Sequence, residues 1–233
     1  MIGILIPAHN EQDLLAQCLQ AALTAARHPE LNGEAVKVTL VLDSCSDGSA
    51  DIAANYDIKV LQIKARNVGI ARGTGAQWLL EQGARWISCT DADSLVADDW
   101  LVAQLALNAD AVCGTVRIED WGTLIDTPAR ARYLAAYQGQ DGHRHIHGAN
   151  LGFSARAYRQ AGGFQPLACH EDVHLVKQFQ ACGASIAWSH RPRVTTSARL
   201  DCRAKGGFGD YLKSLLAGPG PDQHQPDSRP GAL

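Results

Sequence analysis

Short, continuous apolar runs alternate along the chain with stretches whose apolar residues recur at helical spacing. The runs are rich in β-branched residues and predict strands at 2–6, 36–42, 58–63, 86–90 and 111–118. Such runs are typical of parallel strands that are covered on both faces. Helical spacing marks 14–23, 68–81 and 99–107. The alternation predicts an α/β fold, a Rossmann-like α/β/α sandwich with a mostly parallel central sheet.

Polar residues and glycine predict where these helices begin and end. Asn10 and Asp13 are available to cap the first helix. Asn67 directly precedes the second helix, and Gly83 is placed to end it.

After residue 119 the pattern changes to a basic-flanked helix at 127–138, a histidine-rich segment at 143–147 and helices that start near 155 and 170. We interpret this later half as an addition to the first half, so that residues 1–216 form a single domain. The tail 217–233 is rich in proline, glycine and polar residues, and we expect it to be disordered.

Composition excludes several classes of protein. The chain has 233 residues, of which 46% are hydrophobic and 19% charged, and a net charge of −3 argues against nucleic-acid binding. The first strand begins at Ile2 without a preceding basic or long apolar stretch, so we expect a cytoplasmic protein without an integral membrane segment. The 7 cysteines are scattered without any C-x-x-C spacing and are expected to be reduced.

Asp91 and Asp93 follow the strand predicted at 86–90 and precede a helix start at Asp98-Asp99. Ligands of open α/β sheets bind at the carboxyl ends of the strands, where this turn lies. Two neighbouring carboxylates need a cation, and Mg²⁺ or Mn²⁺ suits oxygen ligands and is often completed by substrate phosphates. The turn therefore predicts a metal and a diphosphate ligand, although a solvated Asp-rich turn without metal would have the same sequence.

A dinucleotide-dependent oxidoreductase is the obvious alternative for such a fold. Its G-x-G-x-x-G fingerprint must follow the first strand, whereas this strand continues into Pro7-Ala-His-Asn-Glu11. The Gly-rich stretch 69–75 does not follow a strand in the required frame, and its glycines are expected to permit close helix packing. The sequence therefore disfavours nicotinamide chemistry.

Taken in order, several motifs resemble those of the family 2 glycosyltransferases, which have the GT-A fold. They are Ile6-Pro-Ala-His-Asn-Glu11, Val41-Leu-Asp-Ser-Cys-Ser-Asp-Gly-Ser49, Arg66-Asn-Val-Gly-Ile-Ala-Arg72, Thr90-Asp-Ala-Asp93, Gly148-Ala-Asn150, Gly162-Gly-Phe164 and Glu171-Asp172. The resemblance covers about residues 1–210, and Thr195-Thr-Ser-Ala-Arg199 with Gly206-Gly-Phe-Gly209 suggests a subgroup of small soluble bacterial members. It implies transfer of a sugar from a nucleotide diphosphate donor to an acceptor hydroxyl, usually with inversion and with Mn²⁺ or Mg²⁺.

The resemblance also divides the domain into a nucleotide-sugar-binding half, 1–118, and an acceptor-side half, 119–216, which includes Gly148, Ala149 and Asn150. It makes Asp93 the direct metal ligand and Asp91 a contact to the ribose or the donor sugar. Ser44-Cys45-Ser46 departs from the commoner family pattern, and both UDP-sugars and GDP-sugars are candidate donors. The acceptor is not specified.

Further residues are candidates for contact with the donor nucleotide. Those at the end of the first strand are Pro7, Ala8, Asn10 and Glu11. Asp43 could accept a hydrogen bond from a pyrimidine N3–H or a ribose hydroxyl. A hydrogen-bonded turn is the alternative role of Asp43, and a turn or cap is the favoured role of Asp47.

Two residues of the helix predicted at 68–81 and its start have open roles. Asn67 and Arg72 could meet the base or the diphosphate of the donor. The alternatives are helix capping for Asn67 and an exposed helix face for Arg72.

The acceptor hydroxyl needs a base within hydrogen-bond reach. Glu171 and Asp172 at a predicted helix start are candidates, and the family position favours Asp172. The alternative role of Asp172 is a carboxylate that interacts with the helix N-terminus.

Two later features carry open alternatives. His143, His145 and His147 would share one face of a strand, where they could bind zinc, face the acceptor or be buried structural residues. The basic segment 189–205 is either a solvated loop or a lid over the diphosphate, with Arg199 binding phosphate oxygens in a bidentate manner and His190 as a third metal ligand.

Three functions remain in view. The preferred one is a metal-dependent, inverting glycosyltransferase with Asp172 as its base and a homodimer as its candidate assembly. The second is a retaining transferase similar to the glucosyl-3-phosphoglycerate synthases. The third is a nucleotide-sugar binding module without catalytic activity.

Overall fold

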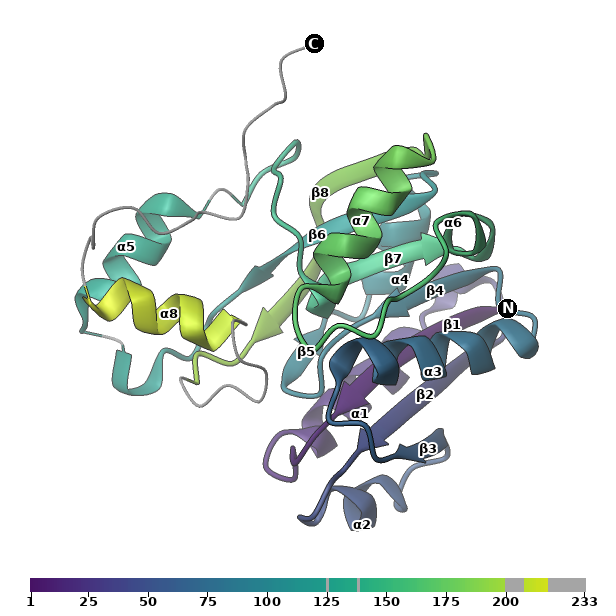
Figure 1. The fold of residues 1–233 in the computed structure, drawn as a ribbon, viewed down its shortest axis with the longest axis horizontal. Coiled ribbons are helices and arrows are strands. Elements are labelled where there is room, and N and C mark those ends of the chain that lie inside the picture. The colour runs from purple at the N-terminus through teal and green to yellow at the C-terminus, as the bar shows by residue number, and fades with distance from the viewer. Residues whose placement is uncertain (125, 138, 200–207, 218–233) are drawn as a thin grey trace.

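The computed structural model describes residues 1–124, 126–137, 139–199 and 208–217. Within them, eight strands form one sheet in the order β3-β2-β1-β4-β7-β6-β8-β5 (Figure 1). The strands are β1 (Ile2–Ala8), β2 (Val36–Asp43), β3 (Lys59–Ile63), β4 (Trp86–Cys89), β5 (Ser94–Val96), β6 (Ala111–Arg117), β7 (Leu151–Ser154) and β8 (Ile186–Thr196). All five strands predicted from the apolar runs are therefore confirmed, whereas β5, β7 and β8 were not predicted.

The helices cover both faces of this sheet. They are α1 (Leu15–Ala26), α2 (Ser49–Ala53), α3 (Val68–Glu81), α4 (Trp100–Leu105), α5 (Pro128–Ala136), α6 (Ala155–Gln160), α7 (Glu171–Ala181) and α8 (Phe208–Ala217), with 3₁₀ turns at Pro29–Leu31, Gly122–Leu124 and Gly148–Asn150. Alternate residues of β1 point to opposite faces, so Ile4 packs with Leu19 of α1 while Leu5 packs with Leu79 of α3. Helices α1 and α4 share the first face, and α3 and α7 share the second.

Strand direction brings the candidate loops to one edge. β1 pairs in parallel with β2 and β4, and β2 pairs in parallel with β3. β7 lies antiparallel between β4 and β6, while β8 is parallel to β6 and antiparallel to β5. The predicted mostly parallel sheet is confirmed. The segments that follow β1, β2 and β4 consequently meet at the carboxyl edge of the sheet.

The glycines of α3 allow the helix to approach its neighbours closely. A Cβ at Gly75 would lie 2.1 Å from Leu5 Cδ1, and one at Gly69 would lie 2.1 Å from the carbonyl oxygen of Gln165. The prediction that these glycines serve close helix packing is confirmed.

The signals predicted for the two ends of α3 are confirmed, whereas neither Asn10 nor Asp13 caps α1. Asn67 Oδ1 accepts a hydrogen bond from the Ile70 N–H at 3.0 Å and caps α3, and Gly83 follows the helix with a φ of +84°. Helix α1 begins after Leu14 without a side-chain cap. Asn10 does not cap α1 because its side chain bonds to the loop after β2 instead.

Much of the predicted basic loop 189–205 is a strand. Its residues up to Thr196 belong to β8, while 200–205 and the tail 218–233 lie outside the described residues. The exposed Arg191 and Arg193 and the intervening Pro192 concealed the strand, since proline is unusual inside a sheet. The register between β6 and β8 shifts at this point, so an irregularity accommodates the proline.

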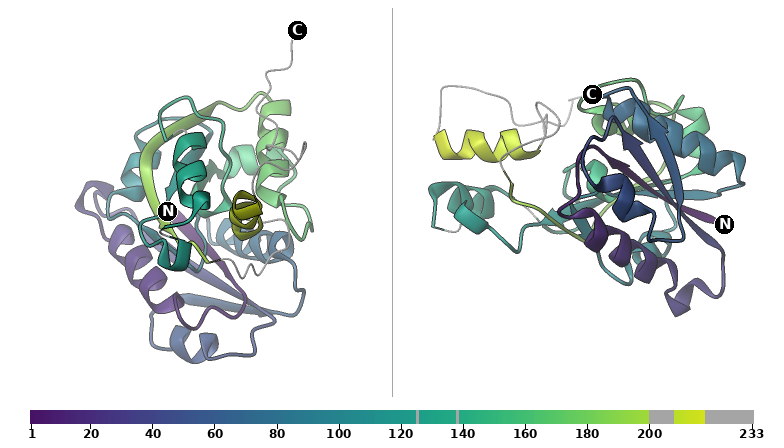
Figure 2. Two further views of the ribbon diagram at one scale, coloured as in Figure 1. Left: turned by 90° about the vertical axis from the view of Figure 1, so that its left-hand side faces the viewer. Right: turned by 90° about the horizontal axis from the view of Figure 1, so that it is seen from below.

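Helices α5 and α8 lie side by side, away from the main sheet (Figure 2). They share a small core that includes Trp121, Tyr133 and Leu212. The Arg132 guanidinium donates to the carbonyl of Leu215 and joins the two helices.

Among the described residues, none of the helices has both the length and the apolar character required to cross a bilayer. The cysteines of the described part of the chain are free thiols, as predicted.

Candidate active site

The end of β1 is tied to the loop after β2. Pro7 and Ala8 are buried, and Asn10 adopts a φ of +55°. Asn10 Oδ1 accepts a hydrogen bond from the Ser46 N–H at 2.8 Å. The Cys45 thiol lies 3.4 Å from both the Ala8 carbonyl and the Asn10 N–H. The unusual Cys45 therefore helps to fix the segment predicted to receive the nucleoside.

A second connection holds Glu11 in place. Its N–H donates to Ser49 Oγ at 2.9 Å, and its side chain is 7% exposed. Asp47 Oδ1 accepts from the Ser49 N–H at 3.0 Å at the start of α2. The predicted turn role of Asp47 is confirmed.

Asp43 ends β2 with its carboxylate inside a backbone turn. Oδ1 accepts from the N–H groups of Ala65 and Arg66, each at 2.8 Å, and from the Ser44 hydroxyl at 2.9 Å. Oδ2 accepts from the Asn67 N–H at 2.8 Å. Burial acts to raise the pKa of Asp43, but the backbone N–H groups outweigh it, so that this pKa lies below its usual range. The structure thus shows the hydrogen-bonded turn, and among the described residues Oδ2 has a single partner.

Asp91 and Asp93 occupy the turn between β4 and β5. The Asp91 carbonyl accepts a hydrogen bond from the Cys18 thiol at 3.3 Å and from the Ser94 N–H at 3.1 Å. Ser94 Oγ donates to Asp93 Oδ1 at 3.2 Å. Burial, followed by the charge of Asp91, raises the pKa of Asp93 to about 6. The two carboxylates therefore crowd each other at the end of a buried strand.

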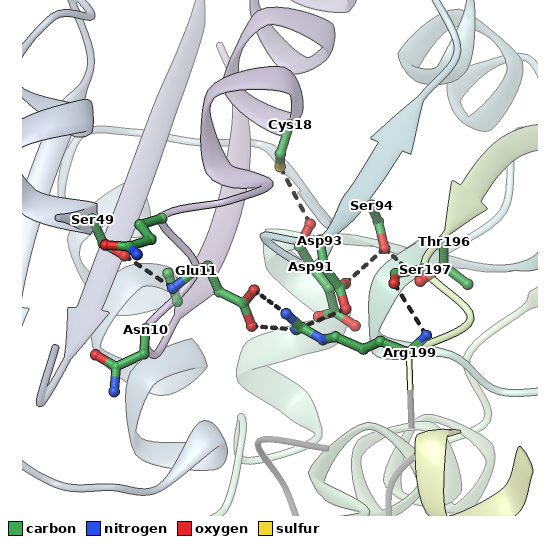
Figure 3. A network of polar contacts seen from close by, with 12 residues as sticks. Asn10, Glu11, Cys18, Ser49, Asp91, Asp93, Ser94, Thr196, Ser197 and Arg199 are labelled. Atoms are coloured by element: carbon green, nitrogen blue, oxygen red, sulfur yellow. Dashed lines mark hydrogen bonds and ion pairs between the residues drawn. The ribbon is translucent and has the colours of Figure 1, made fainter. Parts of the chain in front are cut away.

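Arg199 reaches this turn from the segment after β8 (Figure 3). Its guanidinium donates to both carboxylate oxygens of Glu11, at 2.7 and 2.5 Å, and to Asp93 Oδ2 at 3.1 Å. The late segment thus does approach the predicted metal turn, and here Arg199 pairs with carboxylates.

Arg72 is neither on an exposed helix face nor open to a ligand. Its side chain is 2% exposed, and Nη2 donates to Asp91 Oδ1 at 2.5 Å. Nε donates to Glu171 Oε1 at 2.8 Å, and Nη1 donates to the Gly148 carbonyl at 3.1 Å. Buried partners engage the guanidinium in this arrangement, and its contact with the donor stays a prediction. Asn67, as described above, is a helix cap, which was its alternative role.

Asp172 lies in the first turn of α7. Its Oδ2 accepts from the Gly148 N–H at 2.6 Å, and its Oδ1 accepts from the Val173 N–H at 2.7 Å. Burial raises the pKa of Asp172, while the charge of Arg72 opposes this shift. Burial also raises the pKa of Glu171 to about 7. Asp172 is therefore held by backbone donors, whereas Glu171 is paired with Arg72.

The predicted acceptor residues are interior. Gly148, Ala149 and Asn150 form a buried 3₁₀ turn. Asn150 Nδ2 donates to the carbonyls of Thr115 and Pro192 at 2.8 and 2.9 Å. The side chain of Asn150 is thus engaged in the interior, and its contact with an acceptor stays a prediction.

The three alternate histidines stack their rings. Ring centroids lie 5.6 Å apart for His143 and His145, and 6.0 Å apart for His145 and His147, while Tyr137 stacks on His145 at 4.3 Å. Burial lowers the pKa of His147 to about 3. Stacked rings do not converge on one ion, and the described residues contain no group of three or more His, Cys, Asp or Glu that could hold a metal. The zinc alternative is therefore wrong.

His190 is also directed elsewhere. Its Nδ1 lies 2.9 Å from Asp141 Oδ1, and its N–H donates to the same oxygen at 3.1 Å. Since the described residues form no three-ligand group, the set of Asp91, Asp93 and His190 is not assembled. The role of His190 as a third ligand stays a prediction, since β8 holds this side chain against Asp141.

Two residues that shape the Asp91–Asp93 turn were not predicted from the sequence. Ser94 Oγ donates to Asp93 and also lies 2.9 Å from Thr196 Oγ1, whose hydroxyl can donate to it. Its position directly after Asp93 was an available signal. Cys18 was visible only as one member of the apolar stripe of α1, and its contact with Asp91 depends on the tertiary fold.

The fold is that of the GT-A glycosyltransferases. The chain belongs to glycosyl transferase family 2, whose sequence profile matches residues 3–162. It is therefore a transferase of glycosyl groups. No curated protein sequence matches the chain.

Several solved structures are similar. TarS 1–349 of S. aureus in complex with UDP has a TM-score of 0.61 at 12% identity, over 93% of this chain and 69% of TarS 1–349. Mannosyltransferase PcManGT from Pyrobaculum calidifontis, with GDP-Man and Mn²⁺, has a TM-score of 0.62 at 16% identity, over 93% of this chain and 61% of PcManGT. Glucosyl-3-phosphoglycerate synthase from Mycobacterium tuberculosis, with Mn²⁺, UDP and phosphoglyceric acid, has a TM-score of 0.57 at 14% identity. The match covers 93% of this chain and 75% of the synthase chain. At these identities the likeness concerns the fold.

Proposed function

We propose that this glycosyltransferase moves a sugar from a nucleoside diphosphate to an acceptor hydroxyl, with a divalent metal at Asp93 and with inversion at the anomeric carbon. The observation that carries the proposal is the meeting of the Asp91–Asp93 turn with Asp172. Asp91 and Asp172 come from opposite halves of the chain; Asp91 accepts from Arg72, Asp172 accepts from Gly148, and Arg72 donates to the Gly148 carbonyl, which joins the two carboxylates. A metal carboxylate and a base carboxylate at one sheet edge are the groups that such a transfer requires.

The nucleoside would lie against the ends of β1 and β2, beside Pro7, Ala8, Asn10 and Asp43. Asp43 Oδ2, with one described partner, retains the capacity to accept from a base N–H or a ribose hydroxyl. TarS binds UDP or UDP-GlcNAc, and PcManGT binds GDP-Man, so relatives of the same fold support a UDP- or GDP-sugar as donor.

The donor atoms at the turn fit Mg²⁺ or Mn²⁺. Asp93 and Asp91 have side chains that are 20% and 40% exposed, so carboxylate oxygen is accessible at both. These cations are commonly held by one or two carboxylates together with water and substrate phosphates, so a third protein ligand is not required. The bound metal would neutralise the charge that develops on the departing diphosphate. The Mn²⁺ in two similar structures supports this choice.

Arg199 takes part in the same charge balance. In the free protein its guanidinium balances the negative charges of Glu11 and Asp93. A cation at Asp93 replaces that compensation, and the released guanidinium can then pair with the diphosphate. The segment after β8 would then change its contacts when the donor binds. Arg199 is thus still proposed to bind phosphate.

Asp172 is proposed as the base. The acceptor oxygen forms its bond to the anomeric carbon as the bond from that carbon to the diphosphate oxygen breaks. The hydroxyl proton passes to Asp172, and the nucleoside diphosphate leaves with the bonding electron pair. Burial raises the pKa of Asp172, which strengthens it as a base.

A thermal-shift screen tests the donor and metal assignments. UDP, GDP and their sugars are added with and without Mn²⁺, and a native-state ligand is expected to raise Tm. Asp93→Ala should abolish the part of the shift that depends on Mn²⁺, and Asp57→Asn, at an exposed residue, is the control.

The anomeric configuration of the product, determined by NMR, tests the mechanism. Inversion supports direct displacement with Asp172 as the base. Retention would contradict it and favour the alternative represented by the glucosyl-3-phosphoglycerate synthases.

A further inference from the structure

Arg72 occupies a position where helix α3 packs against the rest of the protein, and packing alone does not call for an arginine. Its neighbours Ala71 and Gly75 are small buried residues. Burying a cation is unfavourable unless it is paired and hydrogen-bonded. A buried arginine here therefore needs a reason in the groups that it contacts.

The guanidinium of Arg72 connects three separate elements. It bonds Asp91 in the turn after β4, the Gly148 carbonyl in the 3₁₀ turn, and Glu171 at the start of α7. Arginine supplies several N–H donors in a fixed planar fork, whereas lysine presents one ammonium. The arrangement consequently requires the shape of the guanidinium as well as its charge.

Gly148 links Arg72 to Asp172 through its two backbone hydrogen bonds. Its carbonyl accepts from Arg72, and its N–H donates to Asp172 Oδ2 at 2.6 Å. A Cβ at Gly148 would lie 2.4 Å from Arg72 Nη2, so the guanidinium can take this position only against a glycine. The location of the Asp172 carboxylate therefore depends on the same residue that receives Arg72.

We propose that Arg72 is a positioning residue that holds the metal-binding turn at Asp91 and the base Asp172 in register with each other, without touching the substrate. The inference rests on the proposed function, since it takes Asp93 as metal ligand and Asp172 as base. Glu171 serves as the countercharge of Arg72. The tight backbone approach at Gly148 makes the arrangement rigid.

The positive charge of Arg72 also affects the pKa of Asp172, separately from its positioning role. Arg72 faces Asp172 from α3, while Asp91 faces it from the turn after β4 and the N–H groups of Gly148 and Val173 bond to it. Arg72 lowers the pKa of Asp172 against the effect of burial. A neutral residue at position 72 should therefore move the acid limb of the rate profile to higher pH, whereas lysine should not.

Arg72→Lys and Arg72→Gln test the proposal, with Arg159→Gln on the exposed side of α6 as the matched control. Turnover is measured with the donor found by the thermal-shift screen, and Mn²⁺ binding in the presence of UDP is measured by electron paramagnetic resonance. Both variants should lose about 100-fold in kcat, the cost of an ångström-scale misplacement. The donor KM should stay within about threefold, since Arg72 touches no donor atom.

Two results would overturn the proposal. A raised donor KM with unchanged kcat would make Arg72 a direct donor ligand, and unchanged kinetics in both variants would make it a packing residue. Should the Arg72 variants fail to fold, Glu171→Gln removes one charge partner and keeps a hydrogen-bond acceptor; it should lower kcat without changing donor KM, and unchanged kcat counts against the proposal. Mn²⁺ binding by Asp93→Ala separates the two claims, because retained binding there refutes the proposed metal site and not the role of Arg72.

Discussion

Replacing Arg199 by alanine separates its role in the free protein from its role in donor binding. A bidentate, charge-assisted contact with a diphosphate contributes roughly 1.5–3 kcal/mol, which corresponds to about 10- to 150-fold in affinity. In the free protein the same guanidinium bonds Glu11 and Asp93, and its side chain is 27% exposed. Breaking those pairs offsets part of the gain, so we expect a loss near the lower end, about tenfold.

The assay is titration calorimetry of UDP and of uridine in the presence of Mn²⁺. Arg199→Ala should weaken UDP binding and leave uridine binding unchanged, because uridine lacks the diphosphate. Arg193→Ala on β8 is the matched control, since this exposed arginine pairs only with the half-exposed Asp99 among described residues. An equal loss for UDP and uridine, or no loss for UDP, would refute the reasoning.

Three further predictions follow from the site and its supports. Asp93→Ala should abolish Mn²⁺ binding and turnover, measured by electron paramagnetic resonance and donor consumption, and full activity in excess EDTA would contradict the metal assignment. Gly148→Ala should destabilise the protein by roughly 1–3 kcal/mol through the 2.4 Å approach to Arg72, seen as a lowered Tm in calorimetry. His147 has a pKa of about 3 against 6.5 in the unfolded chain, so unfolding takes up a proton and stability should fall as pH drops from 6.5 towards 3. His147→Gln should reduce that dependence in urea titrations, and an unchanged dependence would assign it to other groups.

The parts of the fold that follow from local sequence were predictable. Strands β1 and β2 are mostly apolar runs, and α3 has a capping Asn67 and a terminal Gly83. The exposed arginines and Pro192 of β8 hid a strand whose pairing with β6 is tertiary. Local patterns report on neighbours in sequence, and this pairing joins distant segments.

The candidate site shows the same limit. Asp91, Asp93 and Asp172 could be singled out as carboxylates at strand and helix ends. The role of Arg72 could not, because its partner Glu171 is 99 positions away along the chain. The interior role of Asn150 likewise depends on contacts with β6 and β8, which no spacing of residues reveals.

The most direct test of the central claim is the activity of Asp172→Asn, measured together with its donor affinity. Asparagine keeps the size of the side chain and an oxygen for the Gly148 N–H, but it does not accept a proton. The account predicts that kcat falls by roughly 10²–10⁴-fold, the usual contribution of a general base, while the donor Kd stays within about threefold. Near-normal kcat in a folded Asp172→Asn protein would contradict the account, because Asp172 would then serve only the N-terminus of α7.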